Sequence, residues 1–234
     1  MLRLEDVNVQ KGSFRLSGHF TLNQGHICAV LGPSGGGKST LLEAVAGFEP
    51  IRTGRLFWDD QDITDAAPGQ RPIAMLFQDG NLFPHLTAAQ NVGLGLNPNL
   101  RLTADDQSRV KLALAEVGLT GMETRKPAAL SGGQQARVAL ARLMVQQRAL
   151  ILLDEPFAAL GPALKAEMLI LVTDMARAKG ATVLMVTHEP EDARRIAEKV
   201  ILVAEGQAHP PVATEEIFAN PPPTLSDYLG KPER

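Results

Sequence analysis

Residues 26–47, HICAVLGPSGGGKSTLLEAVAG, decide the fold of this chain. The run at 26–31 is apolar and nearly continuous, which is typical of a strand that is buried on both faces. From Lys38 onward the sequence reads as a helix, and Gly47 ends it, since glycine commonly follows the last helical residue. Between strand and helix, residues 32–39 fit the pattern G-x-x-x-x-G-K-[ST]. In this setting the pattern predicts a loop that binds phosphate groups.

The phosphate loop combines backbone donors with two functional side chains. Glycine lets the backbone curl tightly, so that successive N–H groups point at phosphate oxygens. We expect Lys38 to place a positive charge near the β- and γ-phosphates and the Ser39 hydroxyl to reach Mg²⁺. An ordinary glycine-rich turn is the alternative, but a chance match to the full pattern has odds on the order of one in a hundred in a chain of this length. The predicted nucleotide-binding residues of this loop are Gly32, Pro33, Ser34, Gly35, Gly36, Gly37, Lys38, Ser39 and Thr40.

Short apolar runs and helical patterns alternate along much of the remaining chain. Strands are expected at 2–9 and 14–22, before the phosphate loop. A helix over 162–179 begins with Pro162 and stops at Gly180, which is the usual asymmetry of helix ends. Such alternation predicts an α/β fold with a largely parallel sheet covered by helices. Further buried strands are expected at 73–78, 149–154, 181–186 and 199–204.

The middle of the chain, about 85–148, has a different pattern and reads as helix after helix. Thr103 and Asp106 have the spacing of a capping box at a helix start. We therefore predict a helical subdomain at 85–148. It is inserted into a nucleotide-binding α/β core that consists of 1–84 and 149–234, including a short proline-rich tail.

The segment ALILLDEP, residues 149–156, carries two adjacent carboxylates. Its apolar residues predict a buried strand that delivers Asp154 and Glu155 to the carboxyl edge of the sheet, where ligands bind in such folds. Asp154 suits the Mg²⁺ shell, and Glu155, which points elsewhere, could polarise an attacking water as a general base. Two solvated carboxylates at a strand end are the alternative, and the presence of the phosphate loop disfavours it.

Three further features gain meaning only from their context. Gln78 ends the apolar run 73–78 and His188 follows the run 181–186, and a lone residue of either type is more often structural than catalytic. LSGGQ, residues 130–134, is a second glycine-rich turn directly before a helical pattern, so its backbone could also approach an anion closely. Two such turns in one small protein need an explanation beyond a single phosphate site.

In order along the chain, the phosphate loop, Gln78, LSGGQ, LLDEP and His188 resemble the ATP-binding subunits of ABC transporters. The resemblance covers nearly the whole chain, and LSGGQ about twenty residues before the Asp-Glu pair is the signature of that family. It implies a P-loop NTPase (RecA-like) core with a mostly parallel sheet, small antiparallel N-terminal strands and an inserted helical subdomain. Together these parts form the ABC ATPase fold.

The resemblance also implies ATP and Mg²⁺ as ligands and a head-to-tail dimer with a second copy of the chain. Each ATP would lie between the phosphate loop of one subunit and the LSGGQ turn of the other, so the second turn serves the partner's nucleotide. His188 would contact the γ-phosphate, and Gln78 would reach Mg²⁺ and the attacking water. The implied partner-facing residues are Ser131, Gly132, Gly133 and Gln134, the metal residues are Ser39, Gln78 and Asp154, and the catalytic residues are Glu155, His188 and Gln78.

Two positions depart from the family pattern. Gly161 stands where an aspartate usually helps communication across the dimer. Lys11 stands where an aromatic residue usually stacks on adenine, and Phe14 is the nearest aromatic residue. The first departure could weaken coupling between the two sites. The second leaves the regions of Lys11 and Phe14 as candidates for the adenine contact.

The stretch 75–98, the compact length and the lack of a long C-terminal regulatory domain look most like the ATP-binding subunits of bacterial thiamine importers. Importers of iron(III), sulfate or a polyamine are the alternative, since they share most of the motifs. Such a subunit is expected at the cytoplasmic face of the inner membrane, as a peripheral protein. Its partners would be integral-membrane permease subunits and, indirectly, a periplasmic solute-binding protein. Leu82 and Phe83 could receive a short permease helix, or they could pack into the helical subdomain.

Composition and charge restrict the other classes. The net charge of −3 provides no basic stripe, so a nucleic-acid partner is not expected. The single cysteine, Cys28, favours a reducing compartment, and neither a signal peptide nor a membrane span is evident. Soluble ABC ATPases of DNA maintenance generally add zinc modules or long coiled coils. A P-loop kinase would leave LSGGQ and His188 unexplained.

Overall fold

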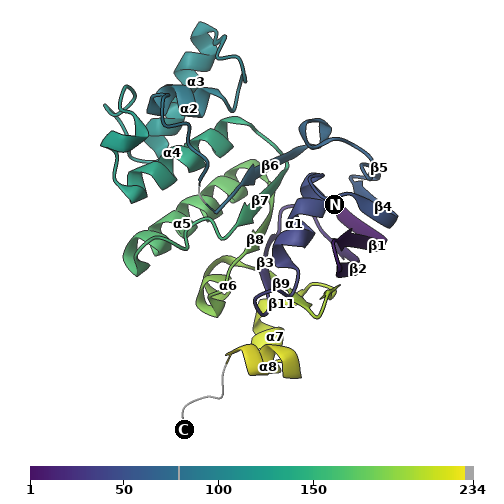
Figure 1. Cartoon of the computed structure of the whole chain (residues 1–234). Coiled ribbons are helices and arrows are strands. Elements are labelled where there is room, and N and C mark those ends of the chain that lie inside the picture. Colours follow the sequence, from purple (N-terminus) through teal and green to yellow (C-terminus); the bar gives the residue numbers. More distant parts are fainter. Residues whose placement is uncertain (79, 230–234) are drawn as a thin grey trace.

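The computed structural model describes residues 1–78 and 80–229, and Figure 1 shows a central sheet with helices on both of its faces. Eleven strands lie within these residues: β1 (Leu2–Lys11), β2 (Phe14–Leu22), β3 (Ile27–Leu31), β4 (Ile51–Trp58), β5 (Gln61–Asp62), β6 (Ile73–Leu76), β7 (Leu150–Asp154), β8 (Thr182–Val186), β9 (Lys199–Ala204), β10 (Gln207–Ala208) and β11 (Val212–Ala213). They form one sheet in the order β5-β4-β1-β2-β10-β9-β3-β8-β7-β6, with β11 paired to β9.

The helices of the described residues mostly connect these strands. The phosphate loop lies between β3 and the first helix, as the sequence predicts. The helices are α1 (Lys38–Ala46), α2 (Ala88–Gly93), α3 (Ala104–Glu116), α4 (Gly132–Val145), α5 (Pro162–Lys179), α6 (Pro190–Ile196), α7 (Thr214–Ala219) and α8 (Pro223–Leu229).

The parallel part of the sheet positions the site. β9, β3, β8, β7 and β6 are parallel neighbours in that order. Every residue of β3 and β8 is buried, which is why these strands are apolar without alternation. Because parallel strands end at one edge, β3, β7 and β8 deliver the phosphate loop, Asp154 and His188 to the same edge of the sheet. The topology confirms the predicted α/β fold with a parallel core, inside a sheet that is mixed as a whole.

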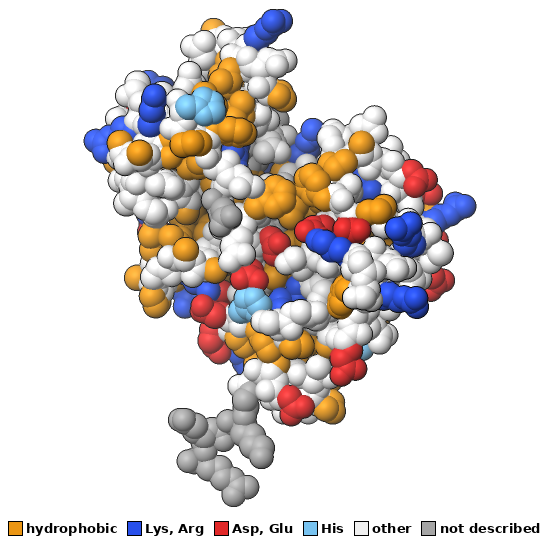
Figure 2. Space-filling model, in the orientation of Figure 1, with side chains coloured by type: hydrophobic (Ala, Val, Ile, Leu, Met, Phe, Trp, Pro, Cys, Tyr) orange, Lys and Arg blue, Asp and Glu red, His pale blue; other side chains and the backbone are white. Residues whose placement is uncertain are grey.

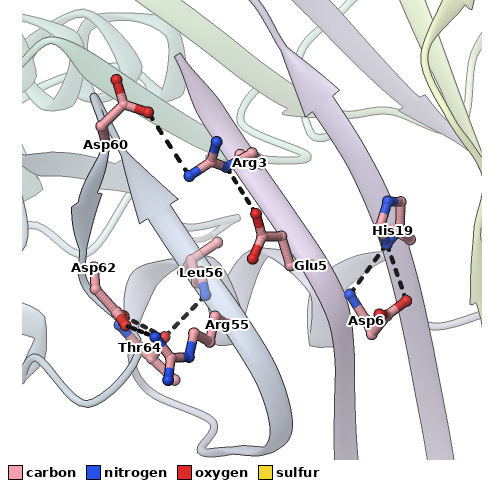
Figure 3. A network of polar contacts seen from close by, with 9 residues as sticks. All are labelled: Arg3, Glu5, Asp6, His19, Arg55, Leu56, Asp60, Asp62 and Thr64. Atoms are coloured by element: carbon pink, nitrogen blue, oxygen red, sulfur yellow. Dashed lines mark hydrogen bonds and ion pairs between the residues drawn. The ribbon is translucent and has the colours of Figure 1, made fainter.

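A small antiparallel unit, formed by β1, β2, β4 and β5, lies at one side of the sheet. β1 pairs with β2 and β4, and β4 pairs with β5, all in antiparallel register. Figure 3 shows polar contacts over this unit, where Arg3 lies between Glu5 and Asp60 at 3.2 and 3.7 Å. The Leu56 amide donates to the Thr64 hydroxyl at 2.9 Å, just beyond β5. Partly exposed ion pairs contribute little to stability, so the buried apolar side chains of these strands hold the unit together.

Helices α2, α3 and α4 pack against one another and lie together at one end of the molecule (Figure 1). Each begins with a capping box, in which the hydroxyl of Thr87, Thr103 or Ser131 accepts a hydrogen bond from the backbone N–H three residues later. The capping box predicted at Thr103 and Asp106 is therefore confirmed. The boundaries of the helical subdomain at 85–148 stay a prediction.

Hydrophobic clusters fill both faces of the sheet. One cluster joins α1 to the N-terminal strands, and the other joins α2 to α8 to the opposite face. β3 contributes to both, because Cys28 and Val30 point into the first cluster and Ile27 and Ala29 into the second. This two-sided burial makes β3 the centre of the fold and fixes the position of the loop that follows it.

Strands β4, β5, β10 and β11 lie outside the ranges predicted from the sequence. The first half of β4 is mostly exposed, and Gly54 interrupts it with a φ of 86°. Its pairing partner β1 lies some forty residues earlier, and no local pattern reveals that contact. In contrast, α5 begins at Pro162 and ends at Lys179, directly before Gly180, as predicted.

Arg71 connects the end of α1 to the segment before β6 through hydrogen bonds to backbone carbonyl oxygens. The residue is 3% exposed, and its guanidinium donates to the carbonyl oxygens of Ala44 and Val45 at 2.8 and 2.7 Å. Two further carbonyl oxygens, between β5 and Arg71, accept from the same group. The positive charge at the C-terminus of α1 is also favoured by the helix dipole.

We expect Arg71→Met to lower the free energy of unfolding by about 1.5–3 kcal/mol, because buried carbonyl oxygens lose a charged donor. Urea denaturation measures the change. Arg52→Met is the matched control, since Arg52 is an exposed arginine of β4. Equal losses in the two variants would contradict the structural role of Arg71.

Candidate nucleotide-binding site

The phosphate loop has a backbone that requires glycine at two positions. Gly32 has a φ of 147°, and a Cβ atom there would lie 1.9 Å from the carbonyl oxygen of Val203. Gly37 has a φ of 108°, and a Cβ atom there would lie 2.9 Å from the ring of Phe14. The tight curl of the loop therefore depends on these glycines.

Lys38 is the charged group of the loop and is 5% exposed. Its Nζ donates to the carbonyl oxygens of Gly32 and Pro33 at 2.8 and 3.0 Å, so the ammonium group lies across the loop. Burial lowers the pKa of Lys38, whereas the nearby Glu155 and Asp154 carboxylates oppose that shift. A phosphate beside the ammonium group would favour its protonated form further.

Ser39 and Asp154 form an oxygen pair that suits Mg²⁺. Ser39 Oγ lies 3.2 Å from Asp154 Oδ1. Adjacent ligands of an octahedral Mg²⁺ ion lie about 2.9 Å apart, given Mg–O distances of about 2.0–2.1 Å, so the pair fits two neighbouring positions. Burial raises the pKa of Asp154, and a bound cation would oppose that shift. The described residues contain no group of three or more metal-ligating side chains, so phosphate and water oxygens would complete the shell.

Glu155 follows β7 with a φ of 47°, a left-handed conformation that is uncommon for a residue other than glycine. Its N–H donates to the carbonyl oxygen of Val186 at 3.2 Å, which ties it to the end of β8. Glu155 Oε1 lies 2.5 Å from His188 Nε2. The Glu155 side chain is largely buried and the His188 side chain is partly exposed. A carboxylate and an imidazole are thus held together beside the phosphate loop.

A cavity of 290 Å³ joins these parts of the site. Glu155 and His188 line it, and so do Lys11 and Phe14. Lys11 Nζ is paired with Glu43 at 2.6 Å, whereas the Phe14 ring packs beside the phosphate loop. Both candidates for the adenine contact therefore border the same cavity, and the contact itself stays a prediction. The loop residues in the lining are Ser34, Gly35, Gly37, Lys38, Ser39 and Thr40.

The structure places Gln78 and the LSGGQ turn beside a different cavity. Gln78 and Gly132 line this second cavity, which also has a volume of 290 Å³, together with residues of α4 and of the segment after Glu155. Among the described residues, no member of the LSGGQ turn lines the first cavity. The roles predicted for Gln78 and the turn therefore depend on a closed or paired state of the protein.

The two glycines of the LSGGQ turn have different surroundings. A Cβ atom on Gly133 would lie 2.2 Å from Leu164, whereas one on Gly132 would have no atom within 4 Å. Ser131 caps α4, because its hydroxyl accepts from the Gln134 N–H at 3.3 Å. The Gln134 side chain in turn accepts from the Ser131 N–H at 3.0 Å. Gly132 is therefore the accessible glycine at the start of α4.

Gly161 is the N-terminal cap of α5, and the cap has no side-chain hydrogen bond. A Cβ atom on Gly161 would meet no atom within 4 Å. An aspartate would fit at this position, and nothing in the structure explains why glycine stands there instead.

The residues that support His188 and its neighbour Thr187 were not predicted from the sequence. The hydroxyl of Tyr228, on α8, donates to the His188 carbonyl oxygen, and Asp192, on α6, accepts from Thr187. Tyr228 lies 40 residues from its partner, so no local spacing reveals the contact. Asp192 lies five residues after Thr187, a spacing that does not match a helix-capping pattern.

The sequence pattern of the ABC transporter family matches residues 17–158, which include the phosphate loop, the LSGGQ turn and Glu155. The chain belongs to the ABC transporter family. As an ABC ATPase it binds ATP, as the motifs predict. Within the ranges that the structure covers, no helix combines the length and the apolar character needed to cross a membrane.

Two similar proteins carry the name thiamine import ATP-binding protein ThiQ. The one from Ruegeria sp. is 60% identical and the one from Cereibacter sphaeroides 56% identical, and each match covers 98% of this chain and 100% of the relative. Two solved dimeric structures of the bacterial ABC transporter cassette MJ0796 also match. The first is 29% identical in sequence, and the second, a post-hydrolysis state bound to ADP and Pi, is 28% identical. Each has a TM-score of 0.79, and each match covers 92% of this chain and 99% of the MJ0796 chain. These matches confirm the ABC ATPase fold.

Proposed function

We propose that this chain is the ATP-hydrolysing subunit of an ABC importer for thiamine. The cargo assignment is supported by the two ThiQ relatives, which are similar over their whole length. Hydrolysis is supported above all by one observation, the 2.5 Å contact of Glu155 with His188 beside the phosphate-loop cavity. The chain would work as a peripheral protein on the cytoplasmic face of the inner membrane.

The binding step uses the phosphate loop and the oxygen pair. The loop N–H groups and the Lys38 ammonium would hold the β- and γ-phosphates, replacing the internal carbonyl contacts of Lys38. Ser39 and Asp154 would hold Mg²⁺, and Gln78 would join them when the site closes. When bound, Mg²⁺ neutralises negative charge between the phosphates and favours their transfer.

The chemical step would rest on Glu155 and His188. Glu155 would orient water and accept its proton as the water attacks the γ-phosphorus, while the bond from that phosphorus to the bridging oxygen breaks and ADP leaves with the electron pair. His188 would leave its pairing with Glu155 to contact the γ-phosphate, which frees the carboxylate for the water. The backbone of Glu155 is strained, with a φ of 47°. The hydrogen bond from its N–H to the Val186 carbonyl oxygen holds this conformation and so keeps the base in place.

In the proposed assembly, two copies pair head to tail around two ATP molecules. The dimeric state of the similar cassette MJ0796 supports a second copy as the partner. Gly132 is exposed at the N-terminus of α4, where backbone N–H groups and the helix dipole favour an anion. Ser131, Gly132, Gly133 and Gln134 would therefore complete the partner's site.

The proposed permease contact lies around Phe83. Phe83 is 46% exposed, and Figure 2 shows hydrophobic side chains along the band between the helical part and the core. The buried Asn91 fixes its backbone, accepting from the Phe83 N–H at 2.8 Å and donating to the Phe83 carbonyl at 3.1 Å. Leu82 is partly buried and packs against the core, which favours packing within the chain over a permease contact for that residue. A fixed backbone with an outward ring suits an apolar helix of the permease.

We expect Phe83→Asp to uncouple hydrolysis from transport. The assay uses a strain of the source bacterium that lacks its own copy, in which the wild-type chain should restore uptake of radiolabelled thiamine. Phe83→Asp should lower that uptake by at least about tenfold, because an aromatic side chain that becomes buried at an interface commonly dominates the binding energy. ATPase activity of the isolated variant should stay within about twofold of wild type, because an exposed side chain away from the site is replaced.

Ile170→Asp is the matched control, since Ile170 is 52% exposed on α5. Uptake by Phe83→Asp at the wild-type level would contradict the proposed contact. Restoration of iron(III), sulfate or polyamine uptake in place of thiamine uptake by the wild-type chain would contradict the proposed cargo. If Ile170→Asp lost uptake and Phe83→Asp did not, the permease would bind the surface around Ile170 on α5 and not the surface around Phe83.

A further inference from the structure

The chain's single tyrosine reaches the candidate site from near the end of the sequence. Tyr228 lies on α8, and its hydroxyl donates a hydrogen bond of 2.5 Å to the carbonyl oxygen of His188. None of the sequence motifs lies in the segment that forms α8. The contact therefore connects a segment without an assigned role to the residue proposed to touch the γ-phosphate.

The short helix α8 is anchored in the core. Leu225 is completely buried, and Tyr228 is partly buried against the same hydrophobic cluster. Burial raises the pKa of Tyr228, and the charges of Glu155 and Glu189 raise it further. The hydroxyl is therefore protonated at neutral pH and available as a donor.

The segment around His188 is also held from α5 and α6. Thr187 Oγ1 donates to Asp192 Oδ2 at 2.7 Å, and Lys165 Nζ pairs with the same carboxylate at 2.7 Å. The Glu189 N–H donates to Thr187 Oγ1 at 3.1 Å, and Lys165 also pairs with Glu189 at 2.8 Å. The neighbours of His188 on both sides are thus fixed. This network holds the N–H side of the His188–Glu189 peptide unit but not its carbonyl oxygen.

We infer that Tyr228 is a positioning residue for ATP hydrolysis. Its hydroxyl holds the carbonyl end of the His188–Glu189 peptide unit, whose N–H end is held by Thr187, and the two contacts together restrict the direction in which the imidazole leaves the backbone. That direction keeps the imidazole at the phosphate-loop cavity, where it contacts Glu155 without ATP and would reach the γ-phosphate when ATP is bound. The inference rests on the proposed function, because it acts through the roles proposed there for His188 and Glu155.

Tyr228→Phe removes the hydroxyl and keeps the packing of the ring. We expect kcat for MgATP hydrolysis by the full chain to fall about threefold to tenfold, which is the range for one lost hydrogen bond. KM for ATP and the melting temperature should remain those of the wild type, since neither the phosphate loop nor the core is changed. Ser226→Ala, an exposed position on the same helix, is the matched control and should keep the wild-type kcat.

A second measurement follows the backbone directly and does not depend on activity. In hydrogen exchange measured by mass spectrometry without nucleotide, Tyr228→Phe should raise the exchange rate of peptides that contain residues 187–190. Peptides from β3 and α4 should exchange as in the wild type. Ser226→Ala should leave both sets unchanged.

His188→Ala separates the two possible failures. If His188→Ala hydrolyses ATP at the wild-type rate, the role proposed for His188 fails, and the present inference fails with it. If His188→Ala is slow but Tyr228→Phe has the wild-type kcat, only the inference is overturned. A Tyr228→Phe variant with a raised KM or a lowered melting temperature at unchanged kcat would likewise overturn it, since Tyr228 would then serve binding or folding.

Discussion

Glu155→Gln is expected to lower kcat for ATP hydrolysis by about 10²–10⁴-fold, the usual contribution of a general base. The amide keeps the size and hydrogen-bonding shape of the carboxylate but cannot accept the proton of the attacking water. The backbone at this position is held by the hydrogen bond to Val186, so the replacement should occupy the same place. Lys38 and Ser39 are untouched, and ATP affinity should therefore remain close to that of the wild type.

The same variant should accumulate as an ATP-bound dimer, because in the proposed assembly hydrolysis would release the pair. Size-exclusion chromatography with light scattering, with and without MgATP, detects the dimer, and phosphate release measures kcat. Glu191→Gln is the matched control, an exposed glutamate on α6 whose ion pair is with Arg194. Near-normal ATPase activity of Glu155→Gln would refute its assignment as the base.

The sequence predicted those parts of the structure that local patterns determine. The buried strand at 26–31 and the helix after Lys38 were readable because continuous burial requires apolar residues and because the loop requires glycines. Because parallel strands end at one edge of the sheet, the positions of Asp154 and Glu155 beside the phosphate loop were also predictable from the sequence. These features follow from the residues' own conformational and burial preferences and from the rule that ligands bind at the carboxyl edge of a parallel sheet.

Other features depend on contacts between distant segments and were not readable. The different surroundings of Gly132 and Gly133 arise because α5 brings Leu164 against one of them. Tyr228 meets His188 only because Leu225 anchors α8 in the core. Each of these contacts is decided by tertiary packing, which leaves no periodic mark in the sequence.

Gly132→Asp is expected to abolish hydrolysis while leaving ATP binding by the monomer almost unchanged. In the single chain, a side chain at Gly132 meets no atom within 4 Å, so the variant should fold normally. In the proposed dimer, its carboxylate would face the γ-phosphate of the partner's ATP and repel it across the interface. We expect the loss of both dimer formation and hydrolysis, by at least about a hundredfold, since like charges at close range cost several kcal/mol at an interface.

The position of the substitution matters. Gly133→Asp would place its Cβ atom 2.2 Å from Leu164 and would disturb packing within one chain, so it cannot separate folding from pairing.

Lys38→Ala is the complementary change within the phosphate loop. It removes the ammonium group from the same subunit's site, so it should weaken ATP binding by the monomer itself. Equilibrium dialysis with labelled ATP distinguishes the two variants.

Mixing the two variants gives the decisive measurement. A heterodimer of Gly132→Asp and Lys38→Ala contains one composite site with both defects and one with neither. If each ATP lies between two subunits, hydrolysis should reappear on mixing, up to about half of the wild-type rate per heterodimer, because one of two equivalent sites is intact. A site confined to one chain would give no recovery, since every site in the mixture would then carry its own subunit's defect. Failure of the folded Gly132→Asp monomer to bind ATP would also exclude the shared site, because Gly132 would then belong to its own subunit's nucleotide.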